Sequence, residues 1–211
     1  MSKQKYEMMS DKMTFRKAML HLKKNDKTLK RIINKLGVIE VNWSPPKPYE
    51  AIVESFIYQQ IAGSAAEAIL KKFKKLYNGR LPTPRQFLKT PEKKVRSAGI
   101  SPQKYSYIKD LCERITKDEL DLESLAELPD EEIIAILDDV RGIGRWTAEM
   151  FLMRSLSRVN VFAADDLGLR NAVQRAYKLK NAPDKKKIAE LSKNWEPYRS
   201  VAALYLWRSI D

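Results

Sequence analysis

Apolar residues recur at helical spacing along most of this chain, and that period most constrains what it can fold into. In the segment EAIVESFIYQQ (50–60), one helical face holds Ile52, Val53, Phe56 and Ile57. Segments 101–115 and 198–209 show the same pattern. Segments with the alternating pattern of a strand are scarce. We therefore predict an all-α protein.

Short polar signals predict where some of these helices begin. Ser101 followed by Pro102 has the form of a capping hydroxyl with proline in the first turn. Ser64 and Glu67 have the spacing of a capping box, after Gly63 interrupts the apolar pattern. A helix, a short loop and a second helix are therefore expected around residues 60–64.

The charge balance favours a polyanionic partner. Lys and Arg total 40 against 27 Asp and Glu, which gives a formal net charge of +13. An excess of this size is typical of nucleic-acid binding, although a merely well-solvated surface would also be basic. No single basic amphipathic segment dominates, so a membrane surface is the less favoured partner.

Scarce cysteine and histidine exclude several kinds of site. Cys112 is the single cysteine, so the chain can form neither an internal disulfide nor a Cys-rich zinc or iron–sulfur site. His21 is the single histidine, which argues against a Ser–His–Asp triad or a His-based metal site. There is no apolar run of about 18 residues and no signal-peptide core, so we expect an intracellular, soluble protein.

The segment LDDVRGIGRWTAEM (137–150) carries the most specific information. Nucleotide-binding loops of the G-x-G kind follow a strand and continue to a third glycine or to Lys-Ser/Thr, and neither is present here. A helix, a tight glycine turn and a second helix remain. Such a turn leaves free N–H groups at a helix N-terminus, where a backbone phosphate can bind. Alternatively, the glycines only satisfy the turn geometry.

The central part, VRGIGRWTA, resembles the helix-hairpin-helix element of the helix-hairpin-helix-GPD superfamily of DNA glycosylases. Four other segments are similar to its 3-methyladenine DNA glycosylase II (AlkA/MAG-like) branch, in family order from about residue 46 to 208. They are PYEAIVESFIYQQIAGSAA, SAGISPQKYSYIKDL, VFAADDLGLR and WEPYRSVAALYLW. Residues 1–45 carry no such motif.

The resemblance implies a two-lobed helical bundle with the active site in the cleft between the lobes. The core would span 46–211, with the hairpin at about 131–156, and residues 1–45 would be a basic helical segment packing on it. The implied activity is that of a monofunctional glycosylase in base excision repair. Such an enzyme flips an alkylated purine of the 3-methyladenine type out of DNA and excises it hydrolytically.

The implied catalytic residue is Asp166, whose carboxylate would stabilise an oxocarbenium-like sugar and orient or deprotonate water. Asp165 is expected to cap the following helix or to support Asp166. Related glycosylases that also cut the DNA backbone carry Lys where this chain has Trp146, so no lyase activity is expected. The residues expected to line the base pocket are Trp146, Trp207, Met150 and Arg208, the last two in places where the better-known branch member has tyrosines.

By the same resemblance, Gln60 is the wedge that fills the gap left by the flipped base. The phosphate contacts are expected from Gly142, Gly144 and Thr147, with Arg145 and Lys104 as helpers. The backbone carbonyls that would hold a structural Na⁺ or K⁺ belong to Asp138, Val140 and Ile143. No other cofactor is required.

Two alternatives stay open. The chain could excise another lesion, such as hypoxanthine or an oxidised or deaminated base, or it could be a non-catalytic DNA-binding module. The expected partner is double-stranded DNA with a damaged base. The protein is expected to be a monomer and to have no membrane partner. The expected location is the cytoplasm or nucleoid of a prokaryote, or the nucleus of a eukaryote.

Overall fold

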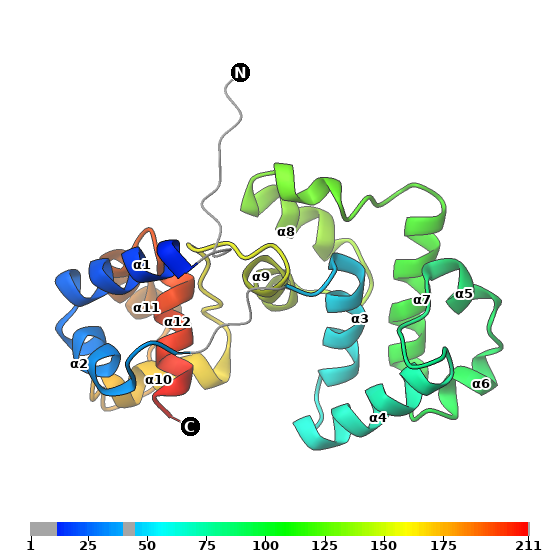
Figure 1. Ribbon diagram of the computed structural model, residues 1–211, viewed down its shortest axis with the longest axis horizontal. Helices are drawn as coiled ribbons and strands as arrows, with labels where there is room; N and C mark the ends of the chain where they lie inside the picture. The colour runs from blue at the N-terminus through cyan, green and yellow to red at the C-terminus, as the bar shows by residue number, and fades with distance from the viewer. Residues whose placement is uncertain (1–11, 40–44, 211) are drawn as a thin grey trace. The chain divides into compact units, whose positions relative to one another are not determined.

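The computed structural model describes residues 12–39 and 45–210. Within these ranges every regular element is a helix and no strand forms, which confirms the all-α prediction. The chain divides into two compact units, in agreement with the two-lobed expectation (Figure 1). Unit 1 comprises Met1–Pro45 with Leu152–Asp211, and unit 2 comprises Pro46–Phe151. None of the described helices is long and apolar enough to cross a bilayer.

Unit 2 is built around α7, which packs against α3, α5 and α6 (Figure 1). Its core is rich in aromatic rings: Phe73 and Phe87 meet edge to face, and Phe87 also contacts Tyr105. The last helix, α9, begins in unit 2 and continues into unit 1. The helices are α3 (Pro48–Tyr58), α4 (Gly63–Lys75), α5 (Pro84–Lys89), α6 (Glu92–Arg96), α7 (Pro102–Thr116), the 3₁₀ helix η1 (Ser124–Glu127), α8 (Asp130–Asp138) and α9 (Arg145–Arg154).

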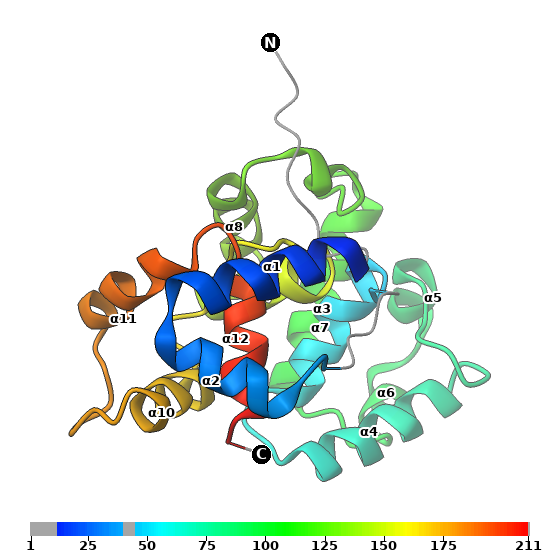
Figure 2. The same cartoon turned by 60° about the vertical axis from the view of Figure 1, so that its left-hand side comes forward.

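Unit 1 is built around α12, which packs against α1, α2 and α10 (Figure 2). Six residues of α12 are buried, on more than one face, as expected of a helix surrounded by others. Tyr205 in this helix is fully buried and stacks on Phe15 of α1. The helices are α1 (Lys12–Asn25), α2 (Lys27–Leu36), α10 (Leu167–Ala176), α11 (Lys185–Ser192), the 3₁₀ helix η2 (Lys193–Trp195) and α12 (Arg199–Arg208).

A buried carboxylate ties the two ends of the chain together in unit 1. Asp26 caps α2, and its Oδ1 accepts hydrogen bonds from the backbone N–H groups of Thr28 and Leu29. Its Oδ2 accepts from the Tyr177 hydroxyl at 2.6 Å and from the Trp195 indole at 3.0 Å. Because this carboxylate is only 7% exposed, its four donors replace the water that it loses on folding.

The compact units differ from the expected division into 1–45 and 46–211. Residues 152–211 group with the N-terminal segment in one unit, and residues 46–151 form the other. Helices α1 and α2 pack on α12. Residues 1–11 and 40–44 of the N-terminal segment lie outside the described residues.

One predicted helix start is confirmed and one is wrong. Ser101 caps α7, with its hydroxyl accepting from Lys104 N at 3.2 Å. The capping box at Ser64 does not form, because α4 already begins at Gly63 with Ala62 as its N-cap. Ser64 is therefore the second residue of the helix, two positions after the N-cap.

Candidate active site

The glycine turn has the helix–turn–helix order expected at about residues 131–156: α8 ends at Asp138 and α9 begins at Arg145. Gly142 lies in the left-handed region with φ +88°, and a Cβ added there would lie 2.4 Å from the ring of Tyr107. Both the backbone conformation and this close approach require glycine. Gly144 has open space around it, so sterics do not explain its identity.

Three hydrogen bonds hold the turn in place. Within it, Ile143 N donates to the carbonyl of Val140 at 3.0 Å. From α7, the Asp110 carboxylate accepts from Arg141 N at 3.0 Å. From the end of α3, the Gln59 amide donates to the carbonyl of Gly142 at 3.0 Å. Two of the three bonds thus come from residues that are distant in the sequence.

The α3–α4 turn holds the expected wedge residue. Gln60 is exposed and adopts a left-handed conformation, with φ +57°. The preceding helix end is fixed by Lys104, whose Nζ donates to the carbonyl of Ile57 at 2.7 Å. Burial lowers the pKa of Lys104. Gln59 and Lys104 therefore hold the turn through their hydrogen bonds, while Gln60 itself is exposed.

Besides Arg145, the first turns of α9 carry three of the predicted site residues. Trp146 is 38% exposed, and Met150, four residues later on the same side of the helix, is half-buried. Thr147 is buried, with 6% exposure. Its side chain is therefore not available for the phosphate contact that the resemblance implies, and only its backbone N–H could make one.

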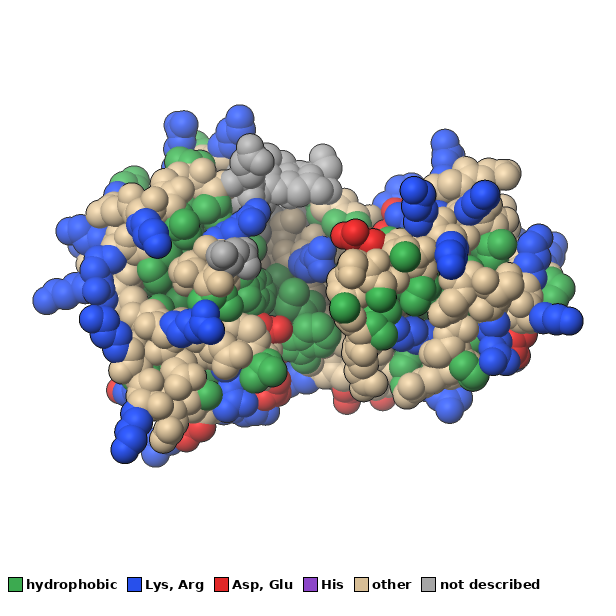
Figure 3. Space-filling view, turned by 90° about the horizontal axis from the view of Figure 1, so that it is seen from below, with side chains coloured by type: hydrophobic (Ala, Val, Ile, Leu, Met, Phe, Trp, Pro, Cys, Tyr) green, Lys and Arg blue, Asp and Glu red, His purple; other side chains and the backbone are tan. Residues whose placement is uncertain are grey.

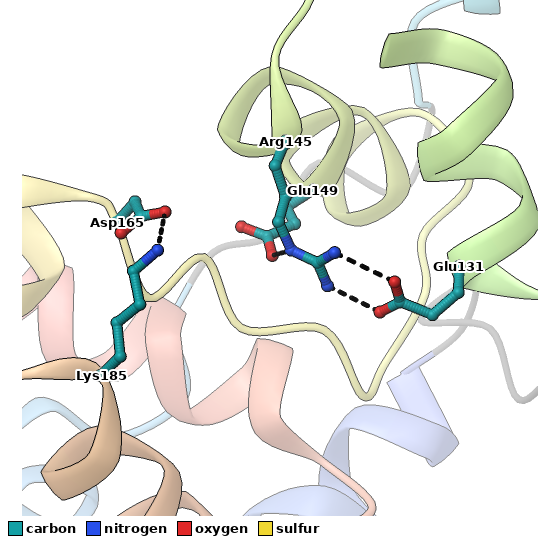
Figure 4. Close-up of polar contacts among 5 residues, drawn as sticks. All are labelled: Glu131, Arg145, Glu149, Asp165 and Lys185. Carbon is teal, nitrogen blue, oxygen red and sulfur yellow. Dashed lines mark hydrogen bonds and ion pairs between the residues drawn. The ribbon is translucent and has the colours of Figure 1, made fainter.

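Arg145, the first residue of α9, is engaged by two carboxylates (Figure 4). Its Nη2 and Nη1 donate to the two oxygens of Glu131 at 2.6 and 3.0 Å, and its Nε donates to Glu149 at 3.0 Å. The hydrogen bonds with Arg145 lower the pKa of Glu131, and the same bonds raise the pKa of Arg145. The expected phosphate-binding arginine thus already has anionic partners in this structure.

Asp166 ends the loop before α10 and is its N-cap. Its Oδ1 accepts from the backbone N–H of Leu169 at 2.6 Å and from the indole Nε1 of Trp207 at 2.9 Å. These two bonds fix the orientation of the carboxylate. Gly168 permits this arrangement, because a Cβ there would lie 3.3 Å from Asp166 Oδ1 and 3.7 Å from Trp207 Nε1.

The prediction that Asp165 caps this helix is wrong. Helix α10 begins at Leu167, so the capping position falls on Asp166, and the same carboxylate that was expected to act in catalysis also caps the helix. Asp165 instead forms an ion pair with Lys185 of α11, with Oδ2 2.8 Å from Nζ (Figure 4). Both side chains are exposed, so this pair adds little stability.

Residues 53–197 match the model of a family described as "HhH-GPD superfamily base excision DNA repair protein". The chain belongs to the HhH-GPD superfamily. This HhH-GPD chain is 36% identical over 197 residues to DNA-3-methyladenine glycosylase 1 of Schizosaccharomyces pombe, covering 92% of this chain and 86% of that protein.

Two solved structures resemble the HhH-GPD chain over most of their length. The first is 3-methyladenine DNA glycosylase of S. pombe in complex with abasic DNA. It is 34% identical with a TM-score of 0.84, and the match covers 92% of this chain and 96% of that one. The second is DNA-3-methyladenine glycosidase of Bacillus halodurans, 32% identical with a TM-score of 0.81. That match covers 98% of this chain and 92% of the other.

The site residues of this HhH-GPD protein fall into two groups, one in each compact unit. Unit 1 brings together Asp166 and Trp207, with the exposed Arg208 beside Trp207 at the end of α12. Unit 2 holds the glycine turn, its α9 residues and the Gln60 turn, which Gln59 links to the hairpin.

Sequence reasoning missed the supporting residues Gln59, Tyr107, Gly168, Glu131 and Glu149. Glycines in amphipathic segments do signal a close approach, which could have singled out Gly168. Glu149 lies four residues after Arg145 in α9, a spacing at which side chains of one helix pair. The other three carry no local pattern, because their partners lie in other helices or turns.

Proposed function

We propose that this HhH-GPD protein is a monofunctional DNA glycosylase. It would act as a monomer on double-stranded DNA, flip an alkylated purine of the 3-methyladenine type out of the helix and hydrolyse its N-glycosidic bond. The observation that carries the proposal is the carboxylate of Asp166, held by Leu169 N and Trp207 Nε1. The names of the relatives, at 36% and 34% identity over most of the chain, support the substrate class.

The proposed chemistry needs one well-placed carboxylate. As the bond between C1′ and the purine nitrogen breaks, its electron pair leaves with the base and positive charge develops on the sugar. Asp166 would stabilise that charge and orient the water that adds to C1′, accepting or relaying its proton. An alkylated purine is already cationic, so it leaves without prior protonation and no nearby histidine is needed.

The base pocket is proposed to involve Trp146 and Trp207. An exposed indole can stack on an electron-poor purine, since the face of the ring attracts positive charge. Met150 and Arg208 would complete the pocket, and with them it is less aromatic than one that carries tyrosines there. This difference favours a second candidate, excision of another lesion such as hypoxanthine, which a panel of lesion-containing duplexes would reveal.

Trp146 is the reason to propose hydrolysis without lyase activity. A Schiff base with the sugar needs an amine at this place, and an indole supplies none. Lys104 does not substitute for it, because its Nζ donates to the carbonyl of Ile57. We therefore expect no covalent adduct with DNA on treatment with borohydride.

DNA binding is proposed to centre on the glycine turn. The N–H groups around Gly142 and Gly144, together with that of Thr147, would bind a backbone phosphate, with help from Lys104 and Arg145. Gln60 would enter the duplex from its exposed turn. Lys and Arg side chains also spread over the face shown in Figure 3, where they would attract the polyanion.

The same turn has carbonyls suited to a monovalent cation. Asp138 ends α8, so its carbonyl lies where helical hydrogen bonding stops, and Ile143 lies in the turn before α9 begins. Val140 already accepts one bond from Ile143 N, and its carbonyl retains a second lone pair. We propose that these three carbonyls hold Na⁺ or K⁺, which would supply positive charge near a bound phosphate.

The test is a matched pair of variants at neighbouring aspartates. Asp166→Asn keeps the shape and the capping oxygen but removes the charge, so base release from methylated DNA should fall by on the order of 100-fold or more while DNA binding persists. Asp165→Asn removes the same charge from the exposed ion pair with Lys185 and should change release by less than about threefold. Equal rates for Asp166→Asn and the wild type would overturn the proposal.

A further inference from the structure

Arg145 carries two carboxylate partners that differ in their exposure. Glu149 is buried, with a side-chain exposure of 9%, whereas Glu131 is 73% exposed. Arg145 itself is 52% exposed and lies directly after Gly144 at the glycine turn. The exposed carboxylate therefore occupies the outer, two-pronged edge of the guanidinium, and the buried one binds Nε.

The occupied edge is the one that a phosphate would use. The Nη1 and Nη2 groups form a planar fork that binds two oxygens of a carboxylate or of a phosphate in the same way. Glu131 holds this fork with two bonds, at 2.6 and 3.0 Å. A DNA phosphate cannot bind there while Glu131 does.

A phosphate can replace the two hydrogen bonds that Glu131 gives up. Glu131 is 73% exposed, so water solvates its carboxylate once it leaves. If Glu131 leaves, the Arg145 charge keeps its bond to the buried Glu149. A polyanion that releases counterions on binding can therefore displace Glu131, but it must first break the two hydrogen bonds.

We propose that Glu131 competes with DNA phosphate for Arg145 and thereby lowers the affinity of the protein for undamaged DNA. This inference rests on the proposed function, since it deepens the DNA-binding role of the hairpin. A chain with net charge +13 binds any DNA through its phosphates. A carboxylate that must be displaced at the hairpin weakens this sequence-independent binding and so shortens the time spent on undamaged sites.

A purely structural role for the pair makes the opposite prediction. If Glu131 only ties α8 to α9, its neutralisation loosens the hairpin, lowers Tm and weakens or leaves unchanged the binding to DNA. If Glu131 competes with phosphate, neutralisation frees the guanidinium fork and strengthens the binding.

The chain offers a matched control at the next residue. Glu131 and Glu132 are both exposed and both lie in the first turn of α8, so Glu131→Gln and Glu132→Gln make the same change in net charge and in the interaction with the helix dipole. They differ in the ion pair with Arg145, which the structure assigns to Glu131.

The experiment measures binding of the full chain to an undamaged duplex by fluorescence anisotropy over a series of salt concentrations. Glu131→Gln should bind roughly threefold or more tighter than Glu132→Gln, with a salt dependence steeper by about one phosphate contact. Adding Arg145→Gln to Glu131→Gln should abolish the gain. Equal affinities for the two glutamine variants, or a gain that survives the loss of Arg145, would overturn the inference.

Wild-type controls separate this inference from the proposed function. If the wild type neither binds DNA nor releases a methylated base, the proposed function fails. If the wild type does both and Glu131→Gln behaves like Glu132→Gln, only the competition fails. Tm is measured for each variant, because a lower Tm with weaker binding identifies the structural role.

Discussion

The indole Nε1 of Trp207 donates a hydrogen bond to Oδ1 of Asp166 at 2.9 Å, across 41 positions of sequence. The same oxygen accepts from Leu169 N at the start of α10. The Asp166 carboxylate therefore caps α10 and is also oriented by a side chain of α12. Its orientation therefore depends on a backbone N–H and on an indole N–H, and neither group carries a charge.

Replacing Trp207 with Phe should slow base release without unfolding the protein. An aromatic ring remains, but the N–H donor to Asp166 is lost, so the carboxylate loses one of the bonds that orient it. We expect the single-turnover rate of base release to fall by roughly tenfold, which corresponds to the free energy of about one hydrogen bond. An unchanged rate, with Tm also unchanged, would show that the bond does not position Asp166.

Gly168→Ala should separate stability from activity. Alanine in a helix is favoured over glycine by about 0.5–1 kcal/mol, so Tm should not fall. The added methyl would lie 3.3 Å from Asp166 Oδ1, closer than a comfortable contact, and should displace the carboxylate or Trp207. We expect base release to fall severalfold. A variant as active as the wild type would show that the site tolerates the methyl.

The two glycines of the hairpin should respond differently to alanine. Gly142→Ala places a Cβ 2.4 Å from the Tyr107 ring at a positive φ, so it should lower the free energy of unfolding by about 2 kcal/mol or more. Gly144→Ala meets no atom within 4 Å and should leave Tm nearly unchanged. Thermal melts of both variants test this, and equal losses of stability would contradict it.

Asp26→Asn should destabilise unit 1. Oδ2 of Asp26 accepts from both the Tyr177 hydroxyl and the Trp195 indole. In asparagine this position can hold an NH₂ group, which would face these two donors with donors of its own. If the amide turns its oxygen towards them, its NH₂ group faces the backbone N–H groups that the carboxylate caps. We expect a loss of about 2–4 kcal/mol in the free energy of unfolding, measured with urea.

The control for Asp26→Asn is Asp184→Asn. Asp184 is an exposed N-cap of α11 whose Oδ1 accepts from the backbone N–H of Lys187 at 2.7 Å, and asparagine caps equally well. A change of less than about 0.5 kcal/mol is expected there. Similar losses for both variants would show that burial of Asp26 adds nothing beyond capping.

Cys112 should be unreactive in the folded protein. It is fully buried, and burial raises the pKa of its thiol to about 12 from 9.0. Because the folded pKa exceeds the unfolded value, the thiol favours the folded state below pH 9 and loses that contribution as the pH rises towards 12. Ellman's reagent at pH 8 should label the protein only in denaturant. Rapid labelling of the native chain would contradict the burial.

Local sequence determined the helices and the order of the motifs. Apolar spacing is a property of neighbouring turns, so it identified the all-α class, and Ser101 capped α7 as predicted. The predicted cap at Asp165 was wrong by one position, and the predicted cap at Ser64 was wrong by two. A capping residue is defined by where its helix begins, and Gly63 and Leu167 already belong to α4 and α10.

Only the tertiary structure decided how the named residues are held. The sequence by itself placed Asp166 after a short apolar segment and Arg145 after a glycine turn, but not the partners of either. Trp207, Gln59 and Asp26 act through hydrogen bonds to segments far along the chain. Such pairs form when packing buries an acceptor and brings a donor next to it in place of water. The local sequence pattern does not predict which donor that is.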